Sequence, residues 1–387
     1  MASSLLCFAI AAAAQNQSAP APASTPQSPA QAPAAAPAPP TWSVGGIDFS
    51  GYLDGYYGYN YNRPSNAANG QSNDLYDFND KTDQFNLAGA VLTLNHNPDP
   101  IGVHADLIFG RANDIIHSST DKSTDNYLEQ AYISYAPAKT HGSEFDFGQF
   151  VTSAGAEVIP AMTDWNYSRS LLFAWAIPFY HFGLRTSTPF TKTWTAGLQV
   201  VNGWNNVVND NGGVTVGLTS ALTKPKYAWD LNYYTGPENY DTQKGYRNLI
   251  DTTLLLTPNA KFNAYINYDY GQNRSPASGS GSTSVSAASD HWSGIAVDAH
   301  EQINAKNAVS VRYEYFDDNA GFATGTTQDL QEVTGTYEYK WTEGLLGRLE
   351  YRRDWSNLAF FHKGNTGMVD AQSTVTLGVI AFFGPKR

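Results

Sequence analysis

Charged residues, cysteine and long apolar runs are all scarce in this chain of 387 residues. Asp, Glu, Lys and Arg make up 15% of it, and its one cysteine, Cys7, lies in an N-terminal apolar run that we expect to be removed. No apolar run reaches 18 residues, which excludes a helical membrane protein of the usual kind. A transmembrane β-barrel is not excluded, because its strands need only about 9 to 11 residues with every second one apolar.

Sequence motifs for catalysis and metal binding are absent as well. The eight histidines are scattered, without an H-E-x-x-H pattern or paired spacing, so we expect no zinc or other metal site. No G-x-S-x-G sequence occurs, and we expect neither an enzyme nor a cofactor. The formal net charge of -12 argues against a nucleic-acid partner and is compatible with a surface that attracts cations.

The first 46 residues divide into two segments by composition. Residues 1–14 contain an apolar run from Leu5 that ends in an A-x-A site at Ala12 to Ala14, which predicts a signal peptide. Residues 15–46 are rich in Ala and Pro and carry no charge before Trp42, so they cannot build a core. We predict an exported protein in which this flexible segment precedes a folded part over residues 47–387.

The folded part shows apolar residues at every second position. In V-S-V-R-Y-E-Y-F, from Val309 to Phe316, the side chains of Val and Tyr point one way while Ser, Arg and Glu point the other. The segment L-L-G-R-L-E-Y-R-R-D, from Leu345 to Asp354, repeats the pattern. One face of each strand is therefore apolar, and the other carries full charges.

Sixteen segments of this kind predict sixteen strands. Eight would run in one direction: Ile47 to Asn60, Gly102 to Arg111, Ser143 to Val151, Thr193 to Asn202, Tyr227 to Tyr234, Lys261 to Tyr270, Ala308 to Phe316 and Leu345 to Asp354. Eight would return: Gln84 to Asn95, Asn126 to Tyr135, Tyr180 to Thr186, Val214 to Leu222, Asn248 to Leu256, His291 to Ala299, Leu330 to Lys340 and Gln372 to Phe383. Among them Gln84 to Asn95, Asn126 to Tyr135 and Asn248 to Leu256 have weak registers, because both of their faces mix polar and apolar residues.

Short turns and long polar loops alternate strictly between these strands, so all long loops fall at one end. An even strand number with one-sided long loops predicts an all-β fold, a transmembrane antiparallel up-and-down β-barrel with short periplasmic turns and long extracellular loops. Proline agrees, because none of the prolines beyond Pro40 falls inside a proposed strand. A soluble β-sandwich or propeller is the alternative, but it would not need loops segregated to one end.

Aromatic residues on the outward faces would form the two girdles of a membrane barrel. The outer girdle would contain Tyr57, Tyr59, Tyr268, Tyr270, Tyr313, Tyr315 and Tyr351. The inner girdle would contain Phe49, Tyr227, Trp229, Phe262, Tyr337, Tyr339, Trp341 and Phe383.

Several motifs in this order resemble those of the OmpL-like β-barrel porins of Gram-negative bacteria, over most of residues 47–383. They are F-S-G-Y-L-D-G-Y-Y from Phe49, E-Q-A-Y-I-S-Y from Glu129, F-G-Q-F from Phe147, N-Y-S-R-S-L-L-F from Asn166, I-P-F-Y-H-F-G from Ile177, V-N-G-W-N from Val201 and R-Y-E-Y-F-D-D from Arg312. The resemblance implies an outer-membrane pore whose partners are outer-membrane lipid, lipopolysaccharide, the barrel-assembly machinery and small hydrophilic solutes. General porins are often trimers, so a homotrimer is a candidate assembly, although no patch in the sequence demands it.

A barrel of sixteen strands is too wide for its own side chains to fill, so it should contain an aqueous channel. We therefore expect passive diffusion of small hydrophilic solutes or ions. The predicted wall is net acidic, which favours a mild preference for cations. Its inward acids are Asp54, Asp106, Asp146, Asp230, Asp269, Glu314, Glu332, Glu338 and Glu350.

The third long loop, 152–179, would narrow the channel if this barrel works like general porins. The loop carries acidic residues and an apolar stretch from Leu171 to Ile177 that could pack on the wall, while arginines on neighbouring strands would face it across the lumen. The candidate constriction residues are Glu157, Asp164, Arg169, Arg185, Arg312, Arg348 and Arg352. Alternatively, the strand arginines simply form ion pairs with Glu314, Glu350 and Asp354.

Two further functions stay open. Inward aromatic residues could form a track for a sugar-specific channel, namely Tyr52, Tyr56, Tyr132 and Tyr265. A plugged barrel could instead serve as an adhesin or an outer-membrane enzyme. The acidic residues Asp74, Asp77, Asp80 and Asp83 in the first long loop do not match an EF-hand spacing, and we interpret them as a solvated acidic loop.

Overall fold

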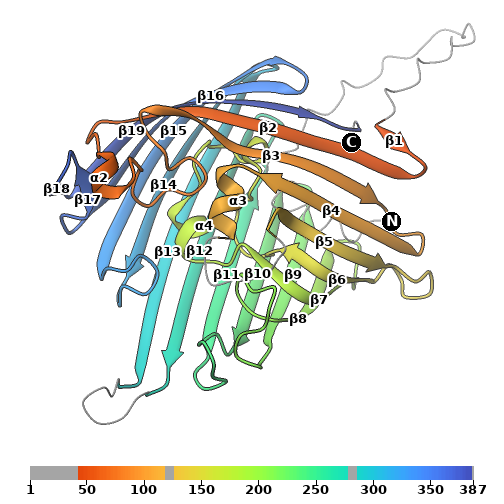
Figure 1. Ribbon diagram of the computed structural model, residues 1–387. Helices are drawn as coiled ribbons and strands as arrows, with labels where there is room; N and C mark the ends of the chain where they lie inside the picture. Colours follow the sequence, from red (N-terminus) through yellow and green to blue (C-terminus); the bar gives the residue numbers. More distant parts are fainter. Residues whose placement is uncertain (1–41, 118–125, 278–285, 386–387) are drawn as a thin grey trace, which may run out of the picture.

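The computed structural model describes residues 42–117, 126–277 and 286–385, and its strands close into one antiparallel barrel (Figure 1). Each strand pairs with its neighbours in the sequence, and β19 closes the ring by pairing with β2. The predicted signal peptide, residues 1–14, and most of the Ala/Pro-rich segment lie outside the described residues. The described part begins earlier than predicted, because Ser43–Val44 (β1) already pairs with the start of β2.

Sixteen strands form the wall, as predicted. The first eight are β2 (Ile47–Asn60), β3 (Gln84–His96), β4 (Ile101–Phe109), β5 (Leu128–Tyr135), β6 (Glu144–Val151), β7 (Tyr180–Pro189), β8 (Trp194–Val201) and β9 (Thr215–Lys224). The others are β10 (Tyr227–Gly236), β11 (Arg247–Leu256), β12 (Phe262–Ser275), β13 (Ala288–Asn304), β14 (Asn307–Asp318), β15 (Gln328–Thr342), β16 (Leu345–Ser356) and β19 (Ala371–Phe383). The prediction that no proline beyond Pro40 falls inside a strand is wrong at one position, because Pro189 is the last residue of β7.

The alternation of side chains sets the two surfaces of the wall. In β14, Val311 and Tyr313 are exposed on the outside, whereas Arg312 and Glu314, which alternate with them, are completely buried on the inside. Apolar side chains on the outer surface are stable only against lipid, because in water they would form an extended exposed apolar surface. None of the helices in the described residues is long and apolar enough to span a membrane.

Two of the three strands for which weak registers were predicted, β3 and β5, contain bulges. The pairing of β2 with β3 shifts at Asp54 and Gly55, and that of β4 with β5 shifts at Asp106 and Leu107. A bulge moves the following side chains to the other face, which explains the mixed pattern of these segments. The third, β11, pairs regularly on both sides, and its mixed pattern has a different cause, described below.

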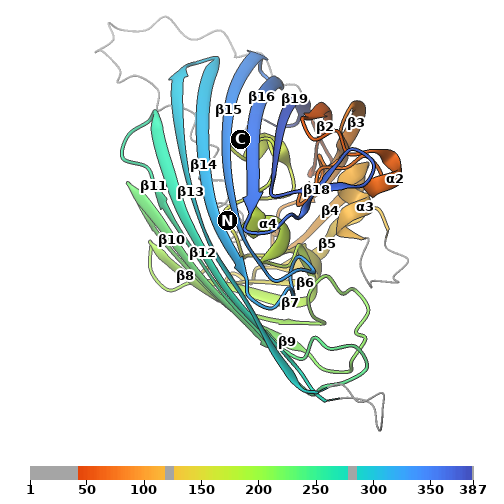
Figure 2. The same cartoon turned by 90° about the vertical axis from the view of Figure 1, so that its left-hand side faces the viewer.

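Loops at one end of the barrel fold into its lumen. The most important are L1 (residues 61–83), L3 (residues 152–179) and L8 (residues 357–370), which contain the elements α2 (Asn66–Asn69), η1 (Ala161–Thr163), α4 (Leu171–Trp175), β17 (Phe361–Lys363) and β18 (Gly367–Val369). The helix α3 (Arg111–Ile116) follows β4. Figures 1 and 2 both show α4 inside the ring of strands.

Apolar side chains from these loops meet apolar side chains of the wall inside the barrel. Leu171, Leu172 and Phe173 of L3 pack in one buried cluster with wall residues such as Leu249 and Trp292. The inward Leu249 explains the mixed pattern of β11, because part of its inner face contacts a loop and not water. The core of this barrel is therefore built between the loops and the wall.

Candidate functional site

L3 crosses the lumen and lies against the wall made by β12–β16, β19 and β2, which we call the packed wall. Ser170 caps α4 by accepting a hydrogen bond from the Phe173 N–H at 3.0 Å. The free N–H groups of Leu171 and Leu172 donate to the Glu314 carboxylate of β14 at 3.0 and 3.1 Å. A wall carboxylate thus satisfies the orphan donors at the start of this short helix.

Arg312 of β14 forms the centre of the contact between L3 and the packed wall. Its guanidinium lies 2.6 Å from Glu157 of L3, 2.6 Å from Glu332 of β15 and 3.1 Å from Glu314. It also donates to the Ser168 carbonyl of L3 at 2.9 Å. All four charged side chains are at most 3% exposed, so each loses its water and depends on these partners.

Arg348 and Arg352 of β16 bind the backbone of L3. Arg348 donates to the Ala161 carbonyl at 2.6 Å and pairs with Glu338 at 2.8 Å. Arg352 donates to the Arg169 carbonyl at 2.6 Å and pairs with Asp354 at 2.7 Å. The fork of a guanidinium allows such a side chain to hold a wall carboxylate and a loop carbonyl together.

L3 is also braced internally. Arg169 pairs with Asp164 at 3.0 Å and donates to the carbonyls of Val158 at 2.8 Å and Tyr167 at 2.6 Å. Both charged side chains are buried. These bonds fold the loop upon itself, so L3 reaches the wall as a compact body.

Six of the seven candidate constriction residues therefore meet in one place. Glu157, Asp164 and Arg169 of L3 are joined, directly or through the loop backbone, to Arg312, Arg348 and Arg352 of the wall. The geometry corrects one expectation, because the acidic loop touches the basic wall and does not face it across an open lumen. The arginines are also not on adjacent strands, since β15 lies between β14 and β16.

The ion-pair alternative is confirmed for two arginines and wrong for the third. Arg312 pairs with Glu314, and Arg352 pairs with Asp354. Arg348 pairs with Glu338, while Glu350 accepts hydrogen bonds from the Tyr167 and Ser168 N–H groups of L3 at 2.6 and 3.0 Å.

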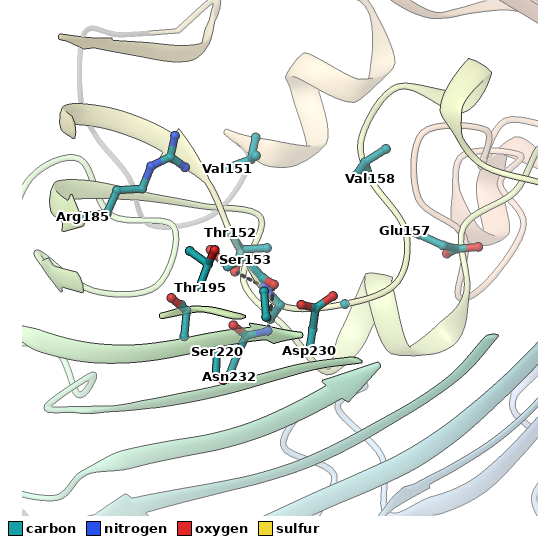
Figure 3. Close-up of a pocket in the computed structure, with 14 residues that line it drawn as sticks. Val151, Thr152, Ser153, Glu157, Val158, Arg185, Thr195, Ser220, Asp230 and Asn232 are labelled. Carbon is teal, nitrogen blue, oxygen red and sulfur yellow. Dashed lines mark hydrogen bonds between the residues drawn. The ribbon is translucent and has the colours of Figure 1, made fainter. Parts of the chain in front are cut away.

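Arg185, the seventh candidate, lies on the opposite side of the lumen. It pairs with Asp146 of β6 at 2.7 Å, and its guanidinium lies over the rings of Phe150 and Tyr132 at 4.5 and 4.9 Å. We call the strands β7–β10 on this side the cavity wall. A cavity of about 50 Å³ lies between this wall, Val151 at the end of β6 and the first arm of L3, residues 152–158 (Figure 3). The arm also touches this wall, because Asn232 donates to the Ser153 carbonyl at 2.9 Å and Gln199 donates to the Ser153 hydroxyl at 3.0 Å.

Three charged side chains line that cavity: Glu157, Arg185 and Asp230. Glu157 and Arg185 already have partners on other elements, Arg312 and Asp146. The other lining residues include the polar Ser153 of L3 and Asn232 of β10 and the apolar Val151 and Val158, so the surface is mixed.

L1 is folded into the barrel, which corrects its interpretation as a solvated acidic loop. Asp80 pairs with Arg111 at 2.7 Å, and Asp74 contacts His362 of L8 at 2.8 Å. Asp77 is 6% exposed, and this burial raises its pKa to about 7. Within the described ranges, no group of three or more Asp, Glu, His or Cys side chains is placed to hold a metal ion.

The inward tyrosines do not form an exposed track for sugars. Tyr52, Tyr56, Tyr132 and Tyr265 are at most 8% exposed. Two of them pack against rings of L3: Tyr56 against Tyr167 at 6.0 Å, and Tyr265 against Trp165 at 5.2 Å.

Sequence reasoning missed three contributors to the contact of L3. Asp298 of β13 accepts from the Asn166 amide at 2.6 Å, and the Trp292 indole donates to the Ala176 carbonyl at 3.0 Å. Tyr76 of L1 lies under Arg352, whose guanidinium is 4.2 Å from the ring centre. The signal for Trp292 was available, because a large apolar residue at an inward position of a wide barrel needs an apolar partner.

Comparisons with known proteins agree with this architecture. The family model described as "Putative beta-barrel porin-2, OmpL-like" matches residues 46–383. No curated protein matches the sequence. Among solved structures, outer-membrane expressed OmpT of Vibrio cholerae is 13% identical with a TM-score of 0.55, covering 87% of this chain and 97% of that one.

Two other solved porins show the same likeness. OmpF of Salmonella typhi, in complex with daunomycin, is 13% identical with a TM-score of 0.55, covering 87% of this chain and 97% of that one. The anion-selective porin from Comamonas acidovorans is 10% identical with a TM-score of 0.55, covering 87% of this chain and 99% of that one. At these identities the likeness extends to the fold alone.

Proposed function

Because the chain belongs to the OmpL-like β-barrel porin family, and is thus an outer-membrane porin, we propose that it passes ions and small hydrophilic solutes between L3 and the cavity wall. The observation that carries this proposal is the position of L3 on the packed wall, fixed there by Arg312, Arg348 and Arg352. The cavity beside the first arm of L3 is lined by polar and apolar side chains and holds about 50 Å³. Such a space admits only a few water molecules, so the pore is narrow.

The seven candidate residues divide into two roles under this proposal. Glu157 and Arg185 line the constriction itself. Asp164, Arg169, Arg312, Arg348 and Arg352 hold L3 in place and thereby set the width of the passage. No catalytic step, cofactor or metal enters this function.

Conductance and solute exclusion test the proposal together. In planar bilayers the refolded protein should give stable, small single-channel steps. In liposome swelling assays, permeation should fall with solute size alone and be lost for larger sugars. A protein that inserts without conducting, or one that passes a particular sugar faster than smaller solutes, would contradict the proposal.

We also propose that the barrel assembles as a homotrimer through the wall of β4–β8. The strands β5, β6 and β8 contain eight residues each, which extend about 27 Å along the strand and about 19 Å across the membrane at a tilt near 45°. That height is less than the apolar band of about 25 Å of such barrels. A solved OmpT of Vibrio cholerae is described as a trimer form.

Small outward residues on this short wall support the same assembly. Ala105, Ala131 and Ala196 lie on its outer surface and allow close approach of a second copy. The mass of the detergent-solubilised wild type should be that of three chains, and Ala131→Trp should reduce it to one. The control is Gly335→Trp on the outer face of the longer strand β15, and this variant should stay trimeric. A monomeric wild type would rule out this assembly.

A further inference from the structure

The strands that carry the three anchoring arginines and the strands β8–β12, which run from the cavity wall to the first strand of the packed wall, differ in how their charges are balanced. On the packed wall each of the three arginines is bound to carboxylates and loop carbonyls, as described above. On strands β8–β12, the Lys and Arg residues stand only at strand ends: Lys224, Arg247 and Arg274. The middle of these strands carries only acidic charges, Asp230, Asp251 and Asp269.

Asp251 and Asp269 lie opposite each other on β11 and β12, and both are completely buried. Asn232 and Asn267 donate to Asp251 at 2.8 and 2.9 Å, and the Gly155 N–H of L3 also reaches it. The two oxygens of Asp269 are buried without a hydrogen bond of normal geometry from the described residues. Two touching carboxyl groups cannot both be ionised there without a positive counter-charge between them, either a proton or a cation.

Asp230 extends this acidic region to the cavity. It is half-buried and stands beside the L3 segment with Ser153, between Arg185 on one side and Glu157 on the other (Figure 3). Arg185 is neutralised by Asp146, and Glu157 by Arg312. The residues opposite Asp230 on the adjacent strands, Ala221 and Thr253, are uncharged. Asp230 is therefore the charge in the cavity that no fixed partner balances.

We propose that Asp230, with the Asp251–Asp269 pair behind it, is a cation-selecting site of the pore. A cation in the passage gains a carboxylate partner in a region of low dielectric, whereas an anion is repelled from it. The fold does not dictate this sign, because one solved porin of the same architecture is described as anion-selective. The inference rests on the proposed passage beside the cavity wall.

Reversal potentials in a potassium chloride gradient test the site. The wild type should favour potassium over chloride, and Asp230→Asn should lower that permeability ratio by about two- to threefold. The matched control is Asp317→Asn, which removes the same charge from the outward face of β14 and should leave the ratio unchanged. Ala221→Lys places a cation next to Asp230 without removing it, and should lower the ratio as well.

The outcomes separate this inference from the proposed function. A wild type that inserts but does not conduct contradicts the proposed function. A conducting wild type that favours chloride, or equal ratios for Asp230→Asn and Asp317→Asn, contradicts the cation-selecting site and leaves the pore intact. If Asp230→Asn fails to fold, Ala221→Lys decides: an unchanged ratio overturns the inference, and a lower one supports it.

Discussion

The packed wall and the cavity wall follow the same strand pattern but serve different purposes. On the packed wall, inward charges such as Arg312, Glu314 and Arg352 are completely buried, because L3 covers them and uses them as partners. On the cavity wall, inward side chains such as Thr195 and Asn232 are polar and mostly uncharged. They line a cavity beside L3, and Asn232 also donates to the Ser153 carbonyl of L3 at 2.9 Å. An inward charge in a wide barrel can therefore be a structural anchor for a loop, and the proposed passage lies on the side of L3 away from the anchors Arg312, Arg348 and Arg352.

The largest effect on this difference should come from removing the central anchor. Arg312→Gln leaves Glu157, Glu314 and Glu332 without their shared cation, and the loss of a partner from such a buried cluster costs about 3–5 kcal/mol. We expect L3 to leave the packed wall and the single-channel conductance to rise. The measurements are chemical unfolding in detergent and planar-bilayer recording.

Arg353→Gln is the matched control for this substitution. Arg353 is exposed on the outer face of the same wall and donates to Ser373 at 3.1 Å. Its removal should change neither stability nor conductance appreciably. Equal conductance of the two variants would show that Arg312 does not hold L3.

A smaller effect is expected from Gly378→Val on β19. A Cβ at Gly378 would collide with the ring of Tyr167, which L3 places directly against this strand. Crowding of this kind costs about 1–3 kcal/mol, and we expect a larger conductance because the loop is pushed away from the wall. Gly335→Val is the control, since nothing lies within 4 Å of its Cβ position; a loss of stability there as large as at Gly378 would refute the steric explanation.

The smallest effect concerns L1 and depends on pH. The buried Asp77 has its pKa raised from 3.8 to about 7, so the folded protein keeps this proton between about pH 4 and 7 while the unfolded chain has lost it. The contribution to stability is therefore fully present below pH 4, decreases as pH rises to 7, and is constant above.

Thermal unfolding midpoints between pH 4 and 8 measure this contribution. The midpoint of the wild type minus that of Asp77→Asn should decrease as pH rises to 7 and then stay constant. Asp241→Asn, in the exposed loop between β10 and β11, should show no such trend. If the midpoint of the wild type minus that of Asp77→Asn grew with rising pH, this would contradict the burial of Asp77.

The alternation of Val309 to Phe316 and similar segments was sufficient to predict the sixteen strands and the inward side of charges such as Arg312 and Glu314, but not the inward side of Asp251 and Asp298. It could not predict the bulges at Ala88 of β3 and Glu129 of β5, because a bulge depends on the pairing of two strands. Nor could it place L3, because the contact of Glu157 with Arg312 joins residues far apart in the sequence. The inward apolar residues Leu249 and Trp292 were the available sign that loops fill the lumen.

The most direct test of the account is the accessibility of the two walls to a charged thiol reagent during bilayer recording. In a Cys7→Ser background, Ser153→Cys places a thiol at the cavity, and Thr336→Cys places one on the packed wall, where the Thr336 hydroxyl donates to Asn166 of L3 at 2.7 Å. We predict that the reagent reduces the current through Ser153→Cys and leaves the current through Thr336→Cys unchanged. Block of Thr336→Cys without block of Ser153→Cys would place the passage on the wrong side of L3 and contradict the account.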